Sequence, residues 1–131
     1  MINFSISELI NSDTAQKNNI NNMPDVNSLD NILNLIVCCL QPIRDLIKKP
    51  MIITSGFRSK KLNQLVGGAT NSHHLIGCAA DFIINGMKPN EIIKIVSSSD
   101  IKFNQLINEY DKWVHISYIK NNCKNQILTF N

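Results

Sequence analysis

The sequence has few aromatic residues and no long run of one charge. Aromatic residues make up 6% of the 131 residues and charged residues 18%, so the aromatic-rich basic surface of a nucleic-acid-binding protein is not predicted. The short basic clusters Lys48-Lys49 and Lys60-Lys61 are typical of a solvated surface. Nucleic acid is therefore not expected as a partner, although the net charge of +3 suits approach to anionic polymers.

Targeting and disulfide signals are also missing. Residues 1–16 lack the basic start and apolar centre of a signal peptide, and no apolar run reaches the length of a membrane span. We therefore expect synthesis in the cytoplasm and no membrane partner. The cysteines show no C-x-x-C spacing, which favours free thiols in a reducing compartment without fixing their disulfide status. They are Cys38, Cys39, Cys78 and Cys123.

The remaining composition is that of one folded unit. A hydrophobic content of 44% and a length of 131 residues suit a single domain, 1–131, with one core, and a monomer is expected. Apolar periodicity and end signals predict a short helix within 3–11, with a capping box of Ser5 and Glu8, and a long helix at 28–48 with Ser28 as its cap. Further helices are predicted at 59–66 and 89–97, with irregular structure at 12–27. Strands are predicted at 51–55, 78–84, 105–107 and 113–119. This order predicts an α+β domain with a mostly antiparallel sheet flanked by helices.

Two histidines and one aspartate form a candidate metal site. His74 and Asp81 belong to a segment of the form S-x-H-x-x-G-x-A-x-D, in which His74 precedes a predicted strand and Asp81 lies within it. His115, in the run WVHIS of a later strand, provides a third ligand. Two imidazoles and a carboxylate leave one zinc position open for water. A buried histidine paired with a carboxylate would have the same spacing, so spacing alone does not decide.

A metal site that breaks bonds also needs a base and a cation. Glu109 lies six residues before His115 and is the preferred base, with Asp111 as the alternative. Arg58, at the end of the first predicted strand, can hold a carboxylate or a developing oxyanion through paired hydrogen bonds. Trp113 would either line the substrate cleft or pack in the core.

The runs TSGFRSKKLNQLVGGATNSHHLIGCAADF and QLINEYDKWVHISY resemble peptidase family M15. That family includes zinc D-alanyl-D-alanine carboxypeptidases, vancomycin-resistance D,D-dipeptidases and phage L-alanyl-D-glutamate endolysins. The likeness extends over nearly the whole chain and is greatest to the short "peptidase M15A, C-terminal" type. It implies a hedgehog/D,D-peptidase-like fold and a Zn²⁺ cofactor held by His74, Asp81 and His115.

The resemblance also implies roles for other residues. Arg58 matches an arginine that steadies substrate and transition state, and Ser72 matches a serine that hydrogen-bonds the substrate. Many members carry an acidic residue three positions before the last ligand, where this chain has Lys112. In the most similar branch the acid ends a Q-[LV]-I-x-E segment, which implies Glu109 as the base.

The implied substrates are peptidoglycan stem peptides, cut at a bond involving D-alanine or D-glutamate. The enzyme would come from a phage or a bacterium and act on the cell wall after release from the cytoplasm. Two alternatives remain open. One is a non-catalytic zinc module that binds wall peptides or a protein, which Lys112 favours; the other is a virion or assembly protein that uses the fold as a scaffold.

Overall fold

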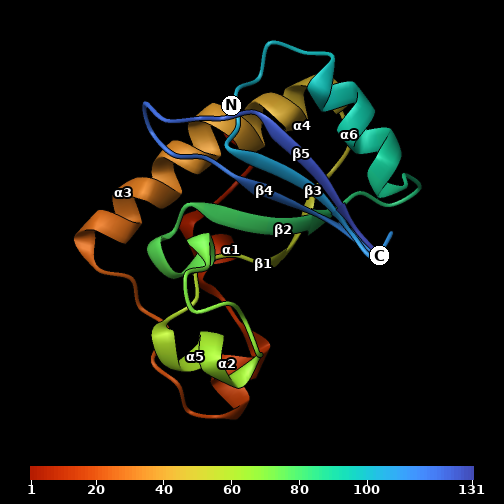
Figure 1. The fold of residues 1–131 in the computed structure, drawn as a ribbon. Helices are drawn as coiled ribbons and strands as arrows, with labels where there is room; N and C mark the ends of the chain where they lie inside the picture. The colour runs from red at the N-terminus through yellow and green to blue at the C-terminus, as the bar shows by residue number, and fades with distance from the viewer.

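Five strands form one mixed sheet in the order β1-β2-β4-β3-β5 in the computed structural model, which describes residues 1–131 (Figure 1). The pairs β1–β2, β2–β4 and β4–β3 are antiparallel, whereas β5 runs parallel to β3. The prediction of an α+β fold with a mostly antiparallel sheet is confirmed. The strands are β1 Ile52–Ser55, β2 Ala79–Ile83, β3 Gln105–Glu109, β4 Trp113–Ser117 and β5 Gln126–Phe130.

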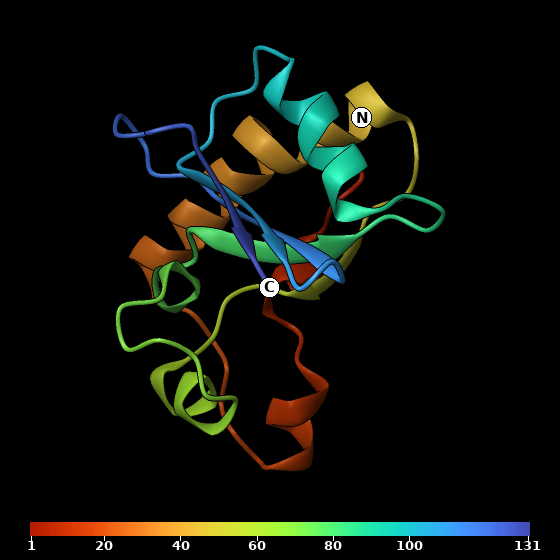
Figure 2. The same cartoon turned by 45° about the vertical axis from the view of Figure 1, so that its right-hand side comes forward.

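Helices lie on both sides of this sheet. Helices α3, α4 and α6 cover one face, while α2 and α5 lie beyond the other (Figures 1 and 2). A π-helical turn joins α3 to α4, and a 3₁₀ turn precedes β2. The elements are α1 Ile6–Ile10, α2 Asp13–Lys17, α3 Val26–Leu35, the π turn η1 Ile36–Leu40, α4 Gln41–Ile47, α5 Lys60–Leu65, the 3₁₀ turn η2 His73–Ile76 and α6 Pro89–Ser97.

The main core fills the space between one face of the sheet and the helices α3, α4 and α6 that cover it. Strand residues alternate between the two faces, so Phe82 and Ile116, which are fully buried, belong to this core. Their neighbours Asp81 and His115 point to the opposite face. The fold therefore places these two polar side chains together, away from the apolar core.

Local end signals explain most helix boundaries. Helix α1 has the predicted capping box, in which Ser5 and Glu8 satisfy each other's backbone N–H groups. Helix α6 begins at Pro89 and ends at Ser97, as predicted. The predicted cap at Ser28 is wrong, because α3 begins at Val26 and Asp25 accepts the Ser28 N–H at 2.7 Å.

Two elements lie where none was predicted. Helix α2 occupies part of the region predicted as irregular, and Ser12 caps it by accepting the Ala15 N–H at 3.1 Å. Strand β5 follows the last predicted strand and forms the edge of the sheet beside β3. The sheet consequently extends one strand further than the sequence analysis predicts.

The continuous helix Val26–Ile47 has the length and mean hydropathy, 1.2, of a membrane span, although the sequence analysis predicts none. Of its most apolar window, 44% is buried inside the fold. Leu35, Leu40 and Ile43 on this helix are fully buried in the core. One packed face on a long apolar helix is typical of a core helix.

Candidate metal centre

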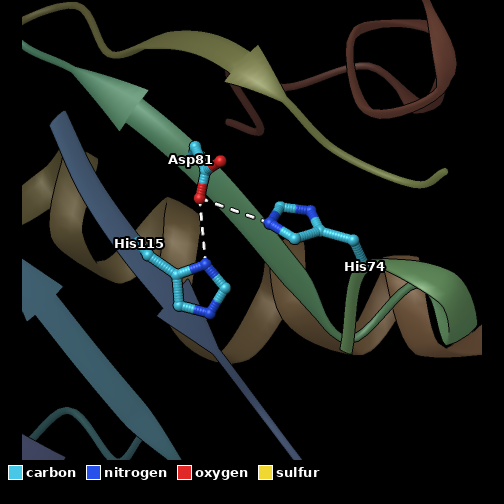
Figure 3. Close-up of side chains that lie close together, drawn as sticks. All are labelled: His74, Asp81 and His115. Atoms are coloured by element: carbon cyan, nitrogen blue, oxygen red, sulfur yellow. Dashed lines mark hydrogen bonds and ion pairs between the residues drawn. The ribbon is translucent and has the colours of Figure 1, made fainter. Parts of the chain in front are cut away.

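His74, Asp81 and His115 meet on the face of the sheet opposite the main core (Figure 3). Asp81 and His115 are directly paired across β2 and β4. The Nδ1 atom of His115 lies 2.9 Å from Asp81 Oδ1, and the Nε2 atom of His74 lies 3.3 Å from the same oxygen. All three side chains are buried. The structure thus brings together the three residues that the sequence motif singles out.

The orientation of His74 is set by the turn that carries it. Ser72 Oγ accepts the His74 backbone N–H at 3.2 Å and caps the 3₁₀ turn η2. The His74 ring donates from Nδ1 to the Gly56 carbonyl oxygen at 2.7 Å, which leaves Nε2 facing Asp81. Gly77 ends the turn with φ +77°, and a Cβ there would collide with the Ser28 carbonyl on α3. Only glycine fits this position, so the turn packs directly on the helix.

The three donors fit a zinc ion. Zinc bonds of about 2.0–2.2 Å put tetrahedral ligand atoms about 3.3 Å apart, close to the separations of Asp81 Oδ1 from the two imidazole nitrogens. All three ligand atoms lie within 4.8 Å of one another. The bond from His74 to the Gly56 carbonyl is the outer support that zinc-bound histidines normally have. This donor set leaves a fourth position for water or substrate.

Burial and neighbouring charges shift the pKa values of two carboxyl groups, Asp81 in the triad and Glu109 at its edge. Burial acts to raise the pKa of Asp81, but hydrogen bonds and charge from His115 and His74 outweigh burial and hold that pKa well below its ordinary value. Burial raises the pKa of Glu109, and the nearby Asp81 carboxylate raises it further, against the opposing effects of His115, His74 and Arg58. Asp81 is therefore an ionised carboxylate, while Glu109 holds a proton more readily than an exposed glutamate.

Arg58 contacts Asp81 on the side away from the histidines. Its Nη2 atom lies 3.6 Å from Asp81 Oδ2, and its Nε atom donates to Ser55 Oγ at 3.1 Å. The Arg58 side chain is 16% exposed, so it retains access to solvent. A guanidinium held this close to the triad can stabilise negative charge on a bound molecule.

The two candidate bases differ sharply in position. Glu109 Oε1 lies 3.8 Å from His115 Nδ1, at the edge of the triad. Asp111 is exposed in the turn after β3, where it has φ +57° and its N–H donates to Asn108 Oδ1. Lys112 is exposed in the same turn. Of these acids, only Glu109 forms a contact with a proposed ligand.

The family comparison agrees with this arrangement. The family model for peptidase M15 matches residues 2–117. The chain belongs to the peptidase M15 family. A search of curated proteins finds none that matches it. The match includes the whole triad, Arg58 and Glu109, and ends before β5.

Two hollows involve residues near the metal centre of this M15 chain, one at His115 and one at Arg58. One, of about 330 Å³, is called here the Phe130 groove and is lined by Ser72, His73, Glu109, His115 and Phe130 among others. The other, of about 570 Å³, lies beside Arg58 and is lined by residues of β1 and of the N-terminal segment. Ser72 thus lies where its hydroxyl can reach a molecule in the Phe130 groove.

Trp113 does not line the Phe130 groove. Its ring packs edge-to-face against Tyr110, with centroids 5.8 Å apart, and its Nε1 atom is buried without a hydrogen-bond partner. Trp113 is half-buried and lies outside the main core, so its contact to substrate stays a prediction.

Sequence reasoning missed one residue of the M15 site. Asn63 is only 3% exposed and accepts a hydrogen bond from Arg58 Nη1 at 3.1 Å. Its own Nδ2 donates to the Ala69 carbonyl at 2.9 Å, which ties Arg58 to the loop before η2. A Cβ on Gly68 would collide with the Asn63 side-chain oxygen. The run LNQLVGG contains both Asn63 and Gly68 and was the available signal.

Proposed function

We propose that this chain is a zinc-dependent metallopeptidase that hydrolyses peptide bonds in peptidoglycan stem peptides, as a D,D-carboxypeptidase or an endolysin-type endopeptidase. The observation that carries the proposal is the convergence of His74, Asp81 and His115 within 4.8 Å in a chain of the M15 family. Glu109 at the edge of this triad and Arg58 beside Asp81 add the acid–base and cationic groups that hydrolysis needs.

When bound, zinc would polarise a carbonyl and lower the pKa of a water molecule at the open position. Glu109 accepts a proton on Oε1 as the water attacks and returns it to the leaving amine. Arg58 donates hydrogen bonds to the oxygen that becomes negative, or to a substrate carboxylate. Ser72 donates from its hydroxyl to substrate in the Phe130 groove. His74 and His115 would hold the metal through Nε2 and Nδ1, the atoms that face Asp81.

Cell-wall peptides are the substrate class that the family resemblance favours. The net charge of +3 supports approach to an anionic wall. We propose cytoplasmic synthesis in a phage-infected or bacterial cell, followed by release to the wall, with the protein acting as a monomer.

A non-catalytic zinc module is the second candidate, because Lys112 stands where many M15 members have an acid and is exposed. Such a module would hold the metal and bind a wall peptide without cutting it. A scaffold role in a virion would need no metal. Zinc content and turnover separate these functions.

The test is digestion of purified peptidoglycan, followed by mass spectrometry of the released muropeptides. Zinc-loaded protein should create new peptide termini, chelation should abolish them, and added zinc should restore them. The substitution His115→Ala should abolish both zinc binding and cleavage. A protein that carries one zinc ion per chain and creates no new termini would overturn the enzymatic proposal in favour of the binding module. The identity of the new termini names the bond.

A further inference from the structure

Strand β5 lies outside the segment that the family model matches, yet it forms one wall of the Phe130 groove. The match ends at residue 117, and β5 covers Gln126–Phe130. Glu109 and Phe130 are register partners on β3 and β5, so both side chains point to the same face of the sheet. Both line the groove next to His115. The part of the chain beyond the matched segment therefore places an aromatic ring beside the proposed catalytic groups.

Strand β5 is fixed at both ends, which holds the backbone of Phe130 in place. At its start the Asn125 N–H donates to the Phe103 carbonyl at 2.8 Å. Gln105 Nε2 donates to Gln126 Oε1 at 2.9 Å across the two strands. At its end the Phe130 carbonyl accepts the Tyr110 N–H at 2.8 Å, immediately after β3. Phe130 is therefore tied to the strand that carries Glu109.

The chemistry of the groove suits an uncharged side chain. Phe130 is 43% exposed, and Ile107 adds a second apolar surface beneath the groove. Gln105 and Asn71 contribute amides, and the groove contains no lysine or arginine. Glu109 is its only acid and would repel a second carboxylate. The cation lies on the other side of the triad, where Arg58 lines the second cavity.

We propose that Phe130 is a specificity-determining residue that binds a neutral, apolar side chain of the substrate beside the scissile bond. This proposal rests on the proposed peptidase function. The ring of Phe130 packs against the substrate side chain, while amides and hydroxyls along the groove bind its backbone. On the other side, Arg58 shares the lining of the second cavity with the acids Glu8 and Asp13.

The test pairs changes in the protein with changes in the substrate. Synthetic stem peptides are made in which each residue in turn is replaced by glycine, and kcat and KM are measured for every peptide. With wild-type protein, replacing an alanine next to the cut by glycine should raise KM about fourfold, the effect of losing one buried methyl group. With Phe130→Ala, the same glycine replacement should change KM less than about twofold, while kcat stays near the wild-type value.

Ile127→Ala is the matched control. Ile127 lies on the same strand, is 48% exposed, and by strand alternation points to the opposite face. Its removal should leave KM unchanged for every peptide, and both variants should keep full zinc content. The proposal is wrong if Phe130→Ala affects all peptides equally, or if Ile127→Ala gives the same pattern.

A binding version keeps this test independent of turnover. The original peptide and its glycine versions are titrated calorimetrically into zinc-loaded wild-type and Phe130→Ala protein. If wild type binds but does not cut, the peptidase proposal fails, and the groove is still judged by whether Phe130→Ala removes the preference for the apolar residue. If neither the original peptide nor any glycine version binds wild-type protein at millimolar concentration, the groove proposal is overturned.

Discussion

Asn63 Oδ1 accepts a hydrogen bond from Arg58 Nη1 at 3.1 Å inside the fold. Asn63 is 3% exposed and also donates to the Ala69 carbonyl, so Arg58 is held against the loop that leads to His74. A long arginine side chain on its own would sample many rotamers. The buried amide therefore fixes the position of the guanidinium relative to the metal ligands.

Removing this amide should weaken the action of Arg58. Asn63→Ala is expected to lower kcat/KM for wall peptides about tenfold, since a hydrogen bond to a charged group contributes about 1.5–3 kcal/mol and solvent partly replaces it. The exposed neighbour Gln64→Ala should have no effect. In an Arg58→Ala background, Asn63→Ala should cause no further loss of kcat/KM. An equal loss in both backgrounds would show that Asn63 acts through folding alone.

Gly77 should be essential for stability. Alanine there would meet both a left-handed backbone, φ +77°, and the Ser28 carbonyl on α3. We expect Gly77→Ala to lower the free energy of unfolding by about 3 kcal/mol, through backbone strain and overpacking together. Gly86→Ala is the matched control, because Gly86 has φ +83° but no neighbour within 4 Å. Its cost should be about 1 kcal/mol. Urea unfolding with chelator present measures both losses of unfolding free energy. Equal losses for Gly77→Ala and Gly86→Ala would contradict the close packing of η2 on α3.

The helix ends that were predicted correctly depend on residues close to them in the sequence. The capping box at Ser5 and Glu8 and the proline at the start of α6 act within a few residues, so the sequence alone reveals them. The triad of His74, Asp81 and His115 was predictable because the runs that contain these residues resemble peptidase family M15, whereas their spacing alone did not decide.

Other features depend on partners far along the chain. Strand β5 contains residues that favour strands, Ile127, Thr129 and Phe130. It is exposed along most of its length and pairs in parallel with β3, so it lacks the buried apolar alternation that marked the other strands. At the start of α3, Asp25 and Ser28 are both good caps three residues apart, and the structure uses the first. The role of Asn63 depends on Arg58 and Ala69 together. No pattern within a short window determines such contacts.

Zinc binding should depend on pH through the histidines. Asp81 has a lowered pKa because His115 and His74 offset the effect of its burial, so it stays ionised until strongly acid pH. Histidine side chains ordinarily take up protons below about pH 6.5. With two imidazole ligands, the apparent zinc affinity should fall up to about a hundredfold per pH unit below about pH 6. Equilibrium dialysis against a zinc buffer measures this.

Two histidine substitutions provide the controls for that titration. His73→Ala should leave the zinc curve unchanged, because His73 is outside the triad. His74→Ala should abolish binding at all pH values. With free zinc held near its dissociation constant at pH 7, a zinc occupancy at about pH 4 equal to that at pH 7 would contradict two imidazole ligands.

The identity of the base can be decided by two isosteric amides. Glu109 contacts the triad at 3.8 Å from His115, whereas Asp111 is exposed in the following turn. Glu109→Gln should lower kcat about 10²–10⁴-fold with zinc retained, because the amide cannot accept the proton. Asp111→Asn should keep kcat within about twofold, since an exposed acid outside the site contributes no proton transfer. The reverse pattern would require the turn to fold over the triad, and the present assignment of Glu109 would then be wrong.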